Sequence, residues 1–133
     1  MYTLTPAMLT GIAQLDAEHH DLVAAINQLR AAEADGTASD CGKQLRRFRD
    51  LLATHFESEE IYLRLLNYPW AGHHADHHGS ILTMLDQLQE ALLGGERQPG
   101  GIAEECYSEL LGTVLTMDLR FLNWHQELQS RSR

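Results

Sequence analysis

The sequence has few cysteines, few basic residues and no long apolar run, and each shortage excludes a class of protein. Cys41 and Cys106 are too few and too far apart for a disulfide framework or a thiolate metal site, so we interpret both as plain small residues. With 10 Lys and Arg against 19 Asp and Glu, the formal charge of -9 argues against binding to nucleic acid or to an anionic membrane surface. No apolar stretch is long enough to span a bilayer.

The first residues of the chain, from Met1 to Pro6, have neither the basic nor the apolar region of a signal peptide. We therefore expect a cytoplasmic protein, or the cytoplasmic part of a larger one. At 133 residues the chain is long enough for a single domain, residues 1–133, with a core of its own. The unusual feature of the composition is its 8 histidines, which cluster in adjacent pairs such as His19-His20, His73-His74 and His77-His78.

Four stretches of the chain place apolar residues at alternating steps of three and four. This spacing directs one face of a helix inward. The four seams run from Leu15 to Leu29, from Leu45 to Leu66, from His74 to Leu92 and from Tyr107 to Leu128.

Breaks between the seams mark the ends of the predicted helices. Gly36 follows the first seam, Pro69 the second, and a glycine-rich loop at residues 94–101 the third. Ser39 or Asp40 is the expected N-cap of the second helix. Four helices joined by short loops predict an all-α fold, an antiparallel up-down-up-down four-helix bundle. Residues 1–11 are expected to form an N-terminal arm packed along its outside.

Every seam is interrupted by side chains that can bind a metal ion. A buried His, Asp or Glu is unfavourable unless something pairs with it. When all four helices carry such residues on their inward faces, a shared metal ion is the simplest explanation. The residues are His19, His55, Glu59, His74, His78 and Asp118, with His125 two turns after Asp118.

The spacing of these residues supports a metal site. His55 and Glu59, like His74 and His78, are four residues apart, so each pair projects from one helix face. One such pair is a weak signal, but two pairs in phase with the apolar seams are a strong one. Imidazoles with carboxylates suit iron, manganese or zinc. Two metal ions bridged by Glu59 are compatible with this set.

Depth along the bundle discriminates between the two candidates on the fourth helix. His19 lies about fifteen residues before the end of its helix and His55 about sixteen after the start of the next, so the two meet at one level. The same count across the glycine-rich loop places His74 level with Asp118 and His125 roughly 10 Å deeper. We therefore predict Asp118 as the ligand. His125 remains either a core histidine, a residue that contacts a ligand, or an alternative ligand.

Several motifs resemble those of the hemerythrin family in its bacterial form, and together they cover nearly the whole chain. The segment from Gly11 to His19 resembles the family's opening G-I-x-x-h-D-x-x-H, where h is apolar, and Ile26 to Leu29 resembles I-N-x-L. The segment from His55 to Glu60 resembles H-F-x-x-E-E, and Tyr68 to His78 resembles Y-P-x-x-x-x-H-x-x-x-H.

The resemblance implies a non-haem centre of two iron ions, bridged by oxo or hydroxo when oxidised, that binds O2 reversibly. It implies that Glu59 bridges the ions and that the iron ligands are His19, His55, His74 and His78. Asp16 and Glu60 also match the family pattern, and we expect them to cap a helix or support a ligand rather than bind iron.

The fourth helix departs from the family pattern W-x-x-x-H-x-x-x-x-D. Aligned on His125, Phe121 replaces the Trp and Ser130 replaces the bridging Asp. Aligned on Asp118, that residue replaces the His and Asn123 replaces the bridging Asp. The depth argument favours the second register. Asn123, like His125, is then a supporting residue or an alternative ligand.

The ligand set leads us to expect a domain that binds O2 or another small diatomic or peroxide ligand, or that senses oxygen, redox state or iron. Such a sensor is typically part of a signalling protein, with a fused or separate output domain. We expect a binding or sensor domain more than an enzyme. The alternatives are a di-iron peroxidase or NO-handling enzyme, and a structural metal-binding bundle.

Other polar and aromatic residues receive plainer interpretations. His20, His73 and His77 lie off the seams and are expected at the solvated surface. Tyr62 and Trp70 are candidates either for lining a ligand pocket or for core packing, and we expect core packing.

Overall fold

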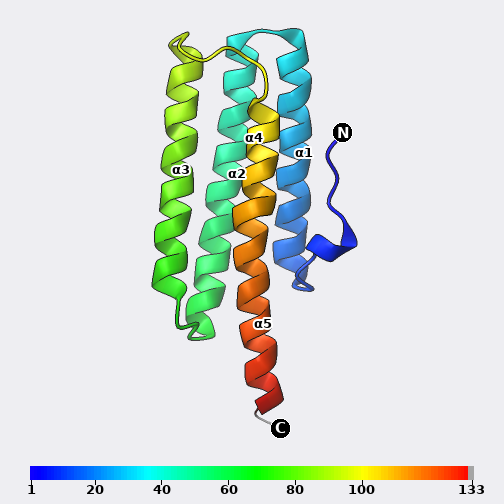
Figure 1. Ribbon diagram of the computed structural model, residues 1–133, viewed down its shortest axis with the longest axis vertical. Coiled ribbons are helices and arrows are strands. Elements are labelled where there is room, and N and C mark those ends of the chain that lie inside the picture. The colour runs from blue at the N-terminus through cyan, green and yellow to red at the C-terminus, as the bar shows by residue number, and fades with distance from the viewer. Residues whose placement is uncertain (132–133) are drawn as a thin grey trace.

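The computed structural model describes residues 1–131, and its helices lie side by side along one long axis (Figure 1). The elements are η1 (Pro6–Met8), α1 (Ala13–Asp35), α2 (Ala38–Leu65), α3 (Ala71–Leu93), α4 (Ile102–Glu109), η2 (Leu110–Val114) and α5 (Leu115–Arg131). Consecutive helices run antiparallel, and α4, η2 and α5 form one continuous rod. Within residues 1–131 there is no strand. The predicted all-α four-helix bundle is confirmed. Among the described helices, none has the length and apolarity needed to cross a bilayer.

The first two helices are joined by a very short turn. Gly36 adopts a left-handed conformation with φ of 78° at the end of α1. Thr37 is then the N-cap of α2, and its hydroxyl accepts a hydrogen bond from the backbone N–H of Asp40 at 3.3 Å. The predicted cap at Ser39 or Asp40 was wrong. Gly36 reverses the direction of the chain in a single residue, so α2 begins earlier than predicted and Thr37 is its N-cap.

The core is divided into two apolar clusters. The larger one fills the bundle toward the α1–α2 turn and includes Leu22, Leu52 and Ile81. The smaller one, at the other end, centres on Leu63, Tyr68 and Phe121. Along each helix the predicted metal-binding residues fall between the two clusters. The polar layer is therefore bounded by apolar side chains above and below it.

The cysteines belong to the larger cluster. Cys41 and Cys106 are both free and buried, as expected of plain small residues. Burial raises the pKa of Cys106 to about 12, so its thiol stays protonated.

A π-helical segment interrupts the fourth rod of the bundle. The N–H of Leu115 donates to the carbonyl of Leu110, five residues earlier, instead of four. Cys106, before this segment, and Leu110, its first residue, are buried, so the predicted seam through Tyr107 and Leu111 was displaced by one residue. The wider turn resets the helix phase, and the predicted positions from Val114 onward are then correct as far as Phe121.

The N-terminal arm packs along α1 and α4, as Figure 1 shows for α1. The backbone of Tyr2 exchanges two hydrogen bonds with the Asn27 side chain, at 2.8 and 2.9 Å. The Tyr2 ring stacks on Tyr107 with centroids 4.3 Å apart, and the Tyr107 hydroxyl donates to the Thr3 carbonyl. These contacts explain why Tyr107 faces the arm instead of the core.

Candidate metal centre

A layer of buried polar side chains lies between the two apolar clusters. Its members are no more than 2% exposed: His19, His55, Glu59, His74, His78 and Asp118. They form two groups, His19 with His55 and Asp118, and Glu59 with His74 and His78. In each group the three candidate ligand atoms lie within 4.8 Å of one another. All six are residues that the sequence singled out.

The first group joins three different helices. His19 Nε2 on α1 lies 3.1 Å from His55 Nε2 on α2 and 3.0 Å from Asp118 Oδ2 on α5. His55 Nε2 lies 3.7 Å from the same Asp118 oxygen. Both imidazoles and the carboxylate thus direct a nitrogen or oxygen atom at one small volume, the arrangement that a cation requires once the imidazole nitrogens carry no proton.

The two carboxylates connect the two groups. Glu59 turns Oε2 toward His55 Nε2, at 3.4 Å, and Oε1 toward His78 Nε2, at 3.3 Å. Glu59 Oε1 also contacts His74 Nε2. Asp118 turns Oδ2 to His19 and Oδ1 to His74 Nε2, at 3.9 Å. Each carboxylate therefore presents one oxygen to each group, which is the orientation of a bridging ligand.

Several polar atoms in this layer lack a hydrogen-bond partner. Within the described part of the chain they include both carboxylate oxygens of Glu59, Oδ1 of Asp118 and the Nε2 atoms of His74 and His78. Leaving a buried polar atom unpaired costs about 1–3 kcal/mol. Acceptor atoms that point inward toward a common volume fit a bound cation, which would satisfy them together.

Two further carboxylates orient the histidines from behind. Glu18 Oε1 lies 2.8 Å from His55 Nδ1, and Ser58 Oγ donates to Glu18 Oε2 at 2.9 Å. Glu60 Oε2 lies 3.1 Å from His78 Nδ1. A carboxylate that accepts the Nδ1 proton leaves Nε2 free to bind a metal. The supporting role expected for Glu60 agrees with this contact, whereas sequence reasoning missed Glu18 and Ser58.

The sequence gives a weak indication of the contact between Glu18 and His55. Glu18 is three residues after Leu15 and four before Leu22, so it borders the inward face of α1. Asp16, by contrast, lies in the first turn of α1 and binds the end of the N-terminal arm; the N-cap of α1 is Ile12, which makes no side-chain cap hydrogen bond. The Asp16 carboxylate accepts hydrogen bonds from the backbone N–H groups of Thr10 and Gly11, at 2.6 and 3.0 Å, and from the Thr10 hydroxyl.

The electrostatics of the layer are dominated by its carboxylates. Burial would lower the pKa of His55, but Asp118 and Glu59 outweigh it and raise this pKa to about 10. Burial would raise the pKa of Glu59, but its close contacts with Asp118 and with His55, His74 and His78 hold it well below its ordinary value. Burial and the adjacent charge of Glu59 raise the pKa of Asp118. A cation that binds here must therefore displace a proton from His55 near neutral pH.

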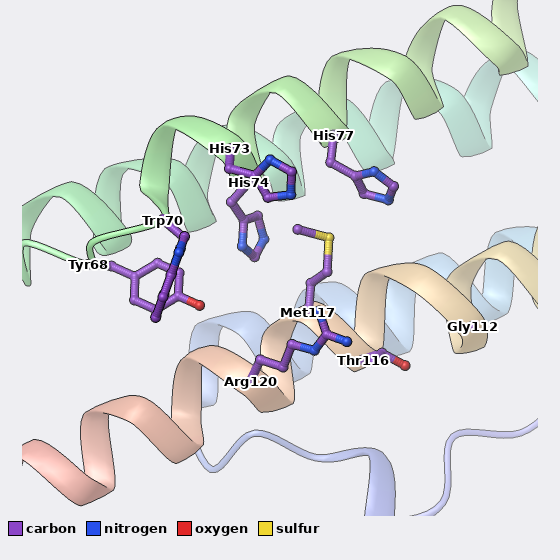
Figure 2. A pocket seen from close by; sticks show the side chains of 9 residues that line it. All are labelled: Tyr68, Trp70, His73, His74, His77, Gly112, Thr116, Met117 and Arg120. Atoms are coloured by element: carbon purple, nitrogen blue, oxygen red, sulfur yellow. The ribbon is translucent and has the colours of Figure 1, made fainter.

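A cavity of about 630 Å³ opens beside the second group, between α3 and α5 (Figure 2). His74 forms part of its wall, so the cavity leads from solvent to the metal-binding layer. Trp70 lines it with 56% of its surface exposed, so the core-packing interpretation of Trp70 was wrong, although Tyr62 packs in the smaller apolar cluster. The reason is that Trp70 lies in the α2–α3 turn, outside both helices.

The remaining histidines lie outside the layer. His20 and His73 are exposed, as expected, and His77 is partly buried where α3 borders the cavity. His125 is partly buried, stacks on Phe121 and contacts Gln129. Asn123 is exposed. The structure therefore brings neither Asn123 nor His125 to the polar layer. Asp118 does lie in the layer, with one carboxylate oxygen toward each of the two groups.

The fold and this layer define a class: a four-helix bundle that binds metal ions with inward-facing histidines and carboxylates. Comparison with protein-family models agrees. The chain belongs to the hemerythrin family, because the model of the hemerythrin HHE cation-binding domain matches residues 10–122. The matched segment contains all six residues of the layer. No curated protein sequence gives a significant match to the chain.

Proposed function

We propose that the layer binds two iron ions and that the domain takes up O2 or another small oxidant as an oxygen-binding or redox-, oxygen- or iron-sensing domain. One observation carries the proposal. Glu59 and Asp118 each turn one oxygen toward His55 or His19 and the other toward the histidines of α3. Two adjacent cations would each bind one oxygen of both carboxylates. A single cation would leave one oxygen of each carboxylate unbound.

The residues present divide into two ligand sets. His19 and His55 would hold one ion, and His74 and His78 the other, with both carboxylates shared. The choice of iron follows from the mixed imidazole and carboxylate set together with the family. Iron bound there would supply the redox chemistry and the open coordination positions that O2 binding needs.

The protein's own groups prepare the site for that chemistry. Glu18 and Glu60 keep the Nε2 atoms of His55 and His78 directed inward. The apolar clusters above and below exclude water. The cavity beside His74 provides entry for a small ligand. A sensor would pass the resulting change to an output domain, fused or separate.

The decisive experiment compares absorption spectra of the iron-loaded protein before and after exposure to air, with the iron content measured. Two irons per chain and a new band that disappears on reduction without O2 are expected. One iron per chain, or a spectrum indifferent to air, contradicts the proposal.

The cavity beside His74 is equally compatible with a second candidate function, reduction of peroxide or NO. A cavity of about 630 Å³ admits these small molecules as readily as O2. Steady-state turnover with hydrogen peroxide or NO would identify an enzyme, whereas a stable adduct formed once per centre identifies a binding domain.

A further inference from the structure

The cavity beside His74 is larger than a diatomic ligand requires. Its volume is about 630 Å³, whereas a water molecule occupies roughly 30 Å³ of the liquid. Cavities of several hundred Å³ are typical binding sites for small organic molecules. The chemistry of its wall indicates which kind of molecule it takes.

The wall is basic in a chain that is strongly acidic. The chain has 19 acidic and 10 basic residues, yet the lining includes Arg120 and no Asp or Glu. Figure 2 shows Met117 extending from α5 toward α3, with the Arg120 side chain lying along α5 beside it. Four arginines form ion pairs with carboxylates: Arg46, Arg49, Arg64 and Arg97. Among the described residues 1–131, no ion pair is recorded for Arg120. Its guanidinium is therefore available to an anion, and its planar fork suits a carboxylate.

Hydrogen-bonding groups face the cavity from the opposite helix. His73 and His77 are one turn apart on α3, and both belong to the lining. The Nε2 atom of His77 is buried and has no hydrogen-bond partner among the described residues. A buried ring nitrogen of this kind calls for a partner, which a ligand in the cavity can supply.

The rest of the wall is apolar and aromatic. Trp70 and Tyr68 stand at one end of the cavity, with ring centroids 5.6 Å apart, and Met117 lies on the α5 side. Aromatic faces and a flexible thioether suit a planar apolar body. A small inorganic anion would leave these surfaces without contacts.

We propose that this cavity binds a small organic carboxylate, held at its charged end by Arg120 and along its planar body by Trp70 and Met117, while a polar substituent of the ligand can reach His77. Because the cavity leads to His74, a bound carboxylate also obstructs the path of small ligands to the metal layer. That consequence rests on the proposed function, whereas the binding itself does not.

The test is calorimetric titration of the metal-loaded full chain with benzoate, benzamide and inorganic phosphate. Benzoate is expected to bind at least tenfold more tightly than benzamide, which lacks the charge, and than phosphate, which lacks the apolar body. Arg120→Gln is expected to weaken benzoate binding at least tenfold. Arg46→Gln is the matched control, because Arg46 is 65% exposed on the outer face of α2.

A second variant tests the location. A Cβ placed at Gly112 meets no atom within 4 Å, so Gly112→Leu adds a side chain at the cavity wall whose first carbon has free space. It is expected to abolish benzoate binding while the melting temperature stays unchanged. Equal binding of benzoate and benzamide, phosphate binding as tight as benzoate binding, or benzoate binding unaffected by Arg120→Gln overturns the proposal.

Iron content and the air-dependent spectrum are recorded on the same samples. A protein that binds benzoate but responds to neither iron nor O2 contradicts the proposed function alone. A protein with two irons and an O2-dependent spectrum that does not bind benzoate overturns this inference alone.

Discussion

Glu18 and His55 are 37 residues apart in sequence, yet Glu18 Oε1 lies 2.8 Å from His55 Nδ1. The contact joins α1 to α2 and sets the orientation of the imidazole, so that its Nε2 faces His19 and Asp118. Glu60 makes the equivalent contact with His78 on α3. Each group of the layer therefore contains one histidine held from behind by a carboxylate.

Removing the carboxylate of Glu18 is expected to weaken metal binding. Glu18→Ala leaves His55 Nδ1 without its acceptor, and losses of this kind reduce metal affinity about 10- to 100-fold. Competition with a chromophoric chelator measures the effect. Glu57→Ala is the control, because Glu57 is exposed on the same helix as His55. Similar affinities for the two variants would mean that Glu18 does not orient the ligand.

Substitutions at Asp118 and at His125 are expected to have different effects on the metal content of the protein. Asp118→Ala removes a carboxylate that faces both groups, so we expect the metal content to fall from two ions per chain to about one or fewer. His125→Ala should keep the full complement, because His125 lies outside the layer and contacts Gln129. Metal analysis after desalting decides the matter. An unchanged metal content in Asp118→Ala removes Asp118 from the ligand set.

Metal affinity is expected to rise with pH because of His55. The pKa of His55, raised to about 10 by Asp118 and Glu59 against the effect of burial, keeps the ring protonated at neutral pH. A metal ion binds the neutral ring, so binding releases this proton, and the apparent affinity increases up to about tenfold per pH unit below that pKa. Glu59, whose pKa is held low, is already ionised and releases none.

Proton release can be measured by calorimetry in two buffers with different ionisation enthalpies. The difference at pH 7 is expected to correspond to at least one proton per chain. A metal affinity that is flat between pH 6 and pH 8 would contradict the raised pKa of His55.

The carboxylate of Asp16 is expected to contribute about 1 kcal/mol to stability, the usual net value for a hydrogen-bonded partner. Asp16→Ala removes the acceptor of the backbone N–H groups of Thr10 and Gly11, the residues that connect the N-terminal arm to α1. Burial would raise the pKa of Asp16, but hydrogen bonds from Thr10 and Gly11 lower it overall. Its contribution is therefore present above the ordinary aspartate pKa and disappears as the pH falls through the lowered value.

Urea denaturation of the protein without metal, at both pH 7 and pH 3, measures this contribution. Asp21→Ala, which alters an exposed residue of the same helix, is the control and should be nearly neutral. A difference between the two variants that is as large at pH 3 as at pH 7 would rule out a contribution from the ionised carboxylate of Asp16.

Residues that lie within one helix were the easiest to predict. His55 with Glu59, and His74 with His78, are four apart, and helical geometry alone places each pair on one face. The depth argument added Asp118, because antiparallel helices of known length align their residues from the connecting loop. Helix phase was harder to predict. An unbroken α-helix continued from Cys106 and Leu110 would direct Met117 inward, and the π turn directs Asp118 there instead.

The sequence by itself determined the helices, the inward-facing histidines and the family resemblance, because all three depend on local spacing and short motifs. Only the tertiary structure decided which oxygen faces which histidine, that Glu18 supports His55, and that a cavity separates α3 from α5 beside His74. These features depend on the distances between helices. A carboxylate beside an apolar seam has the same sequence pattern whether it faces water or an imidazole on the neighbouring helix.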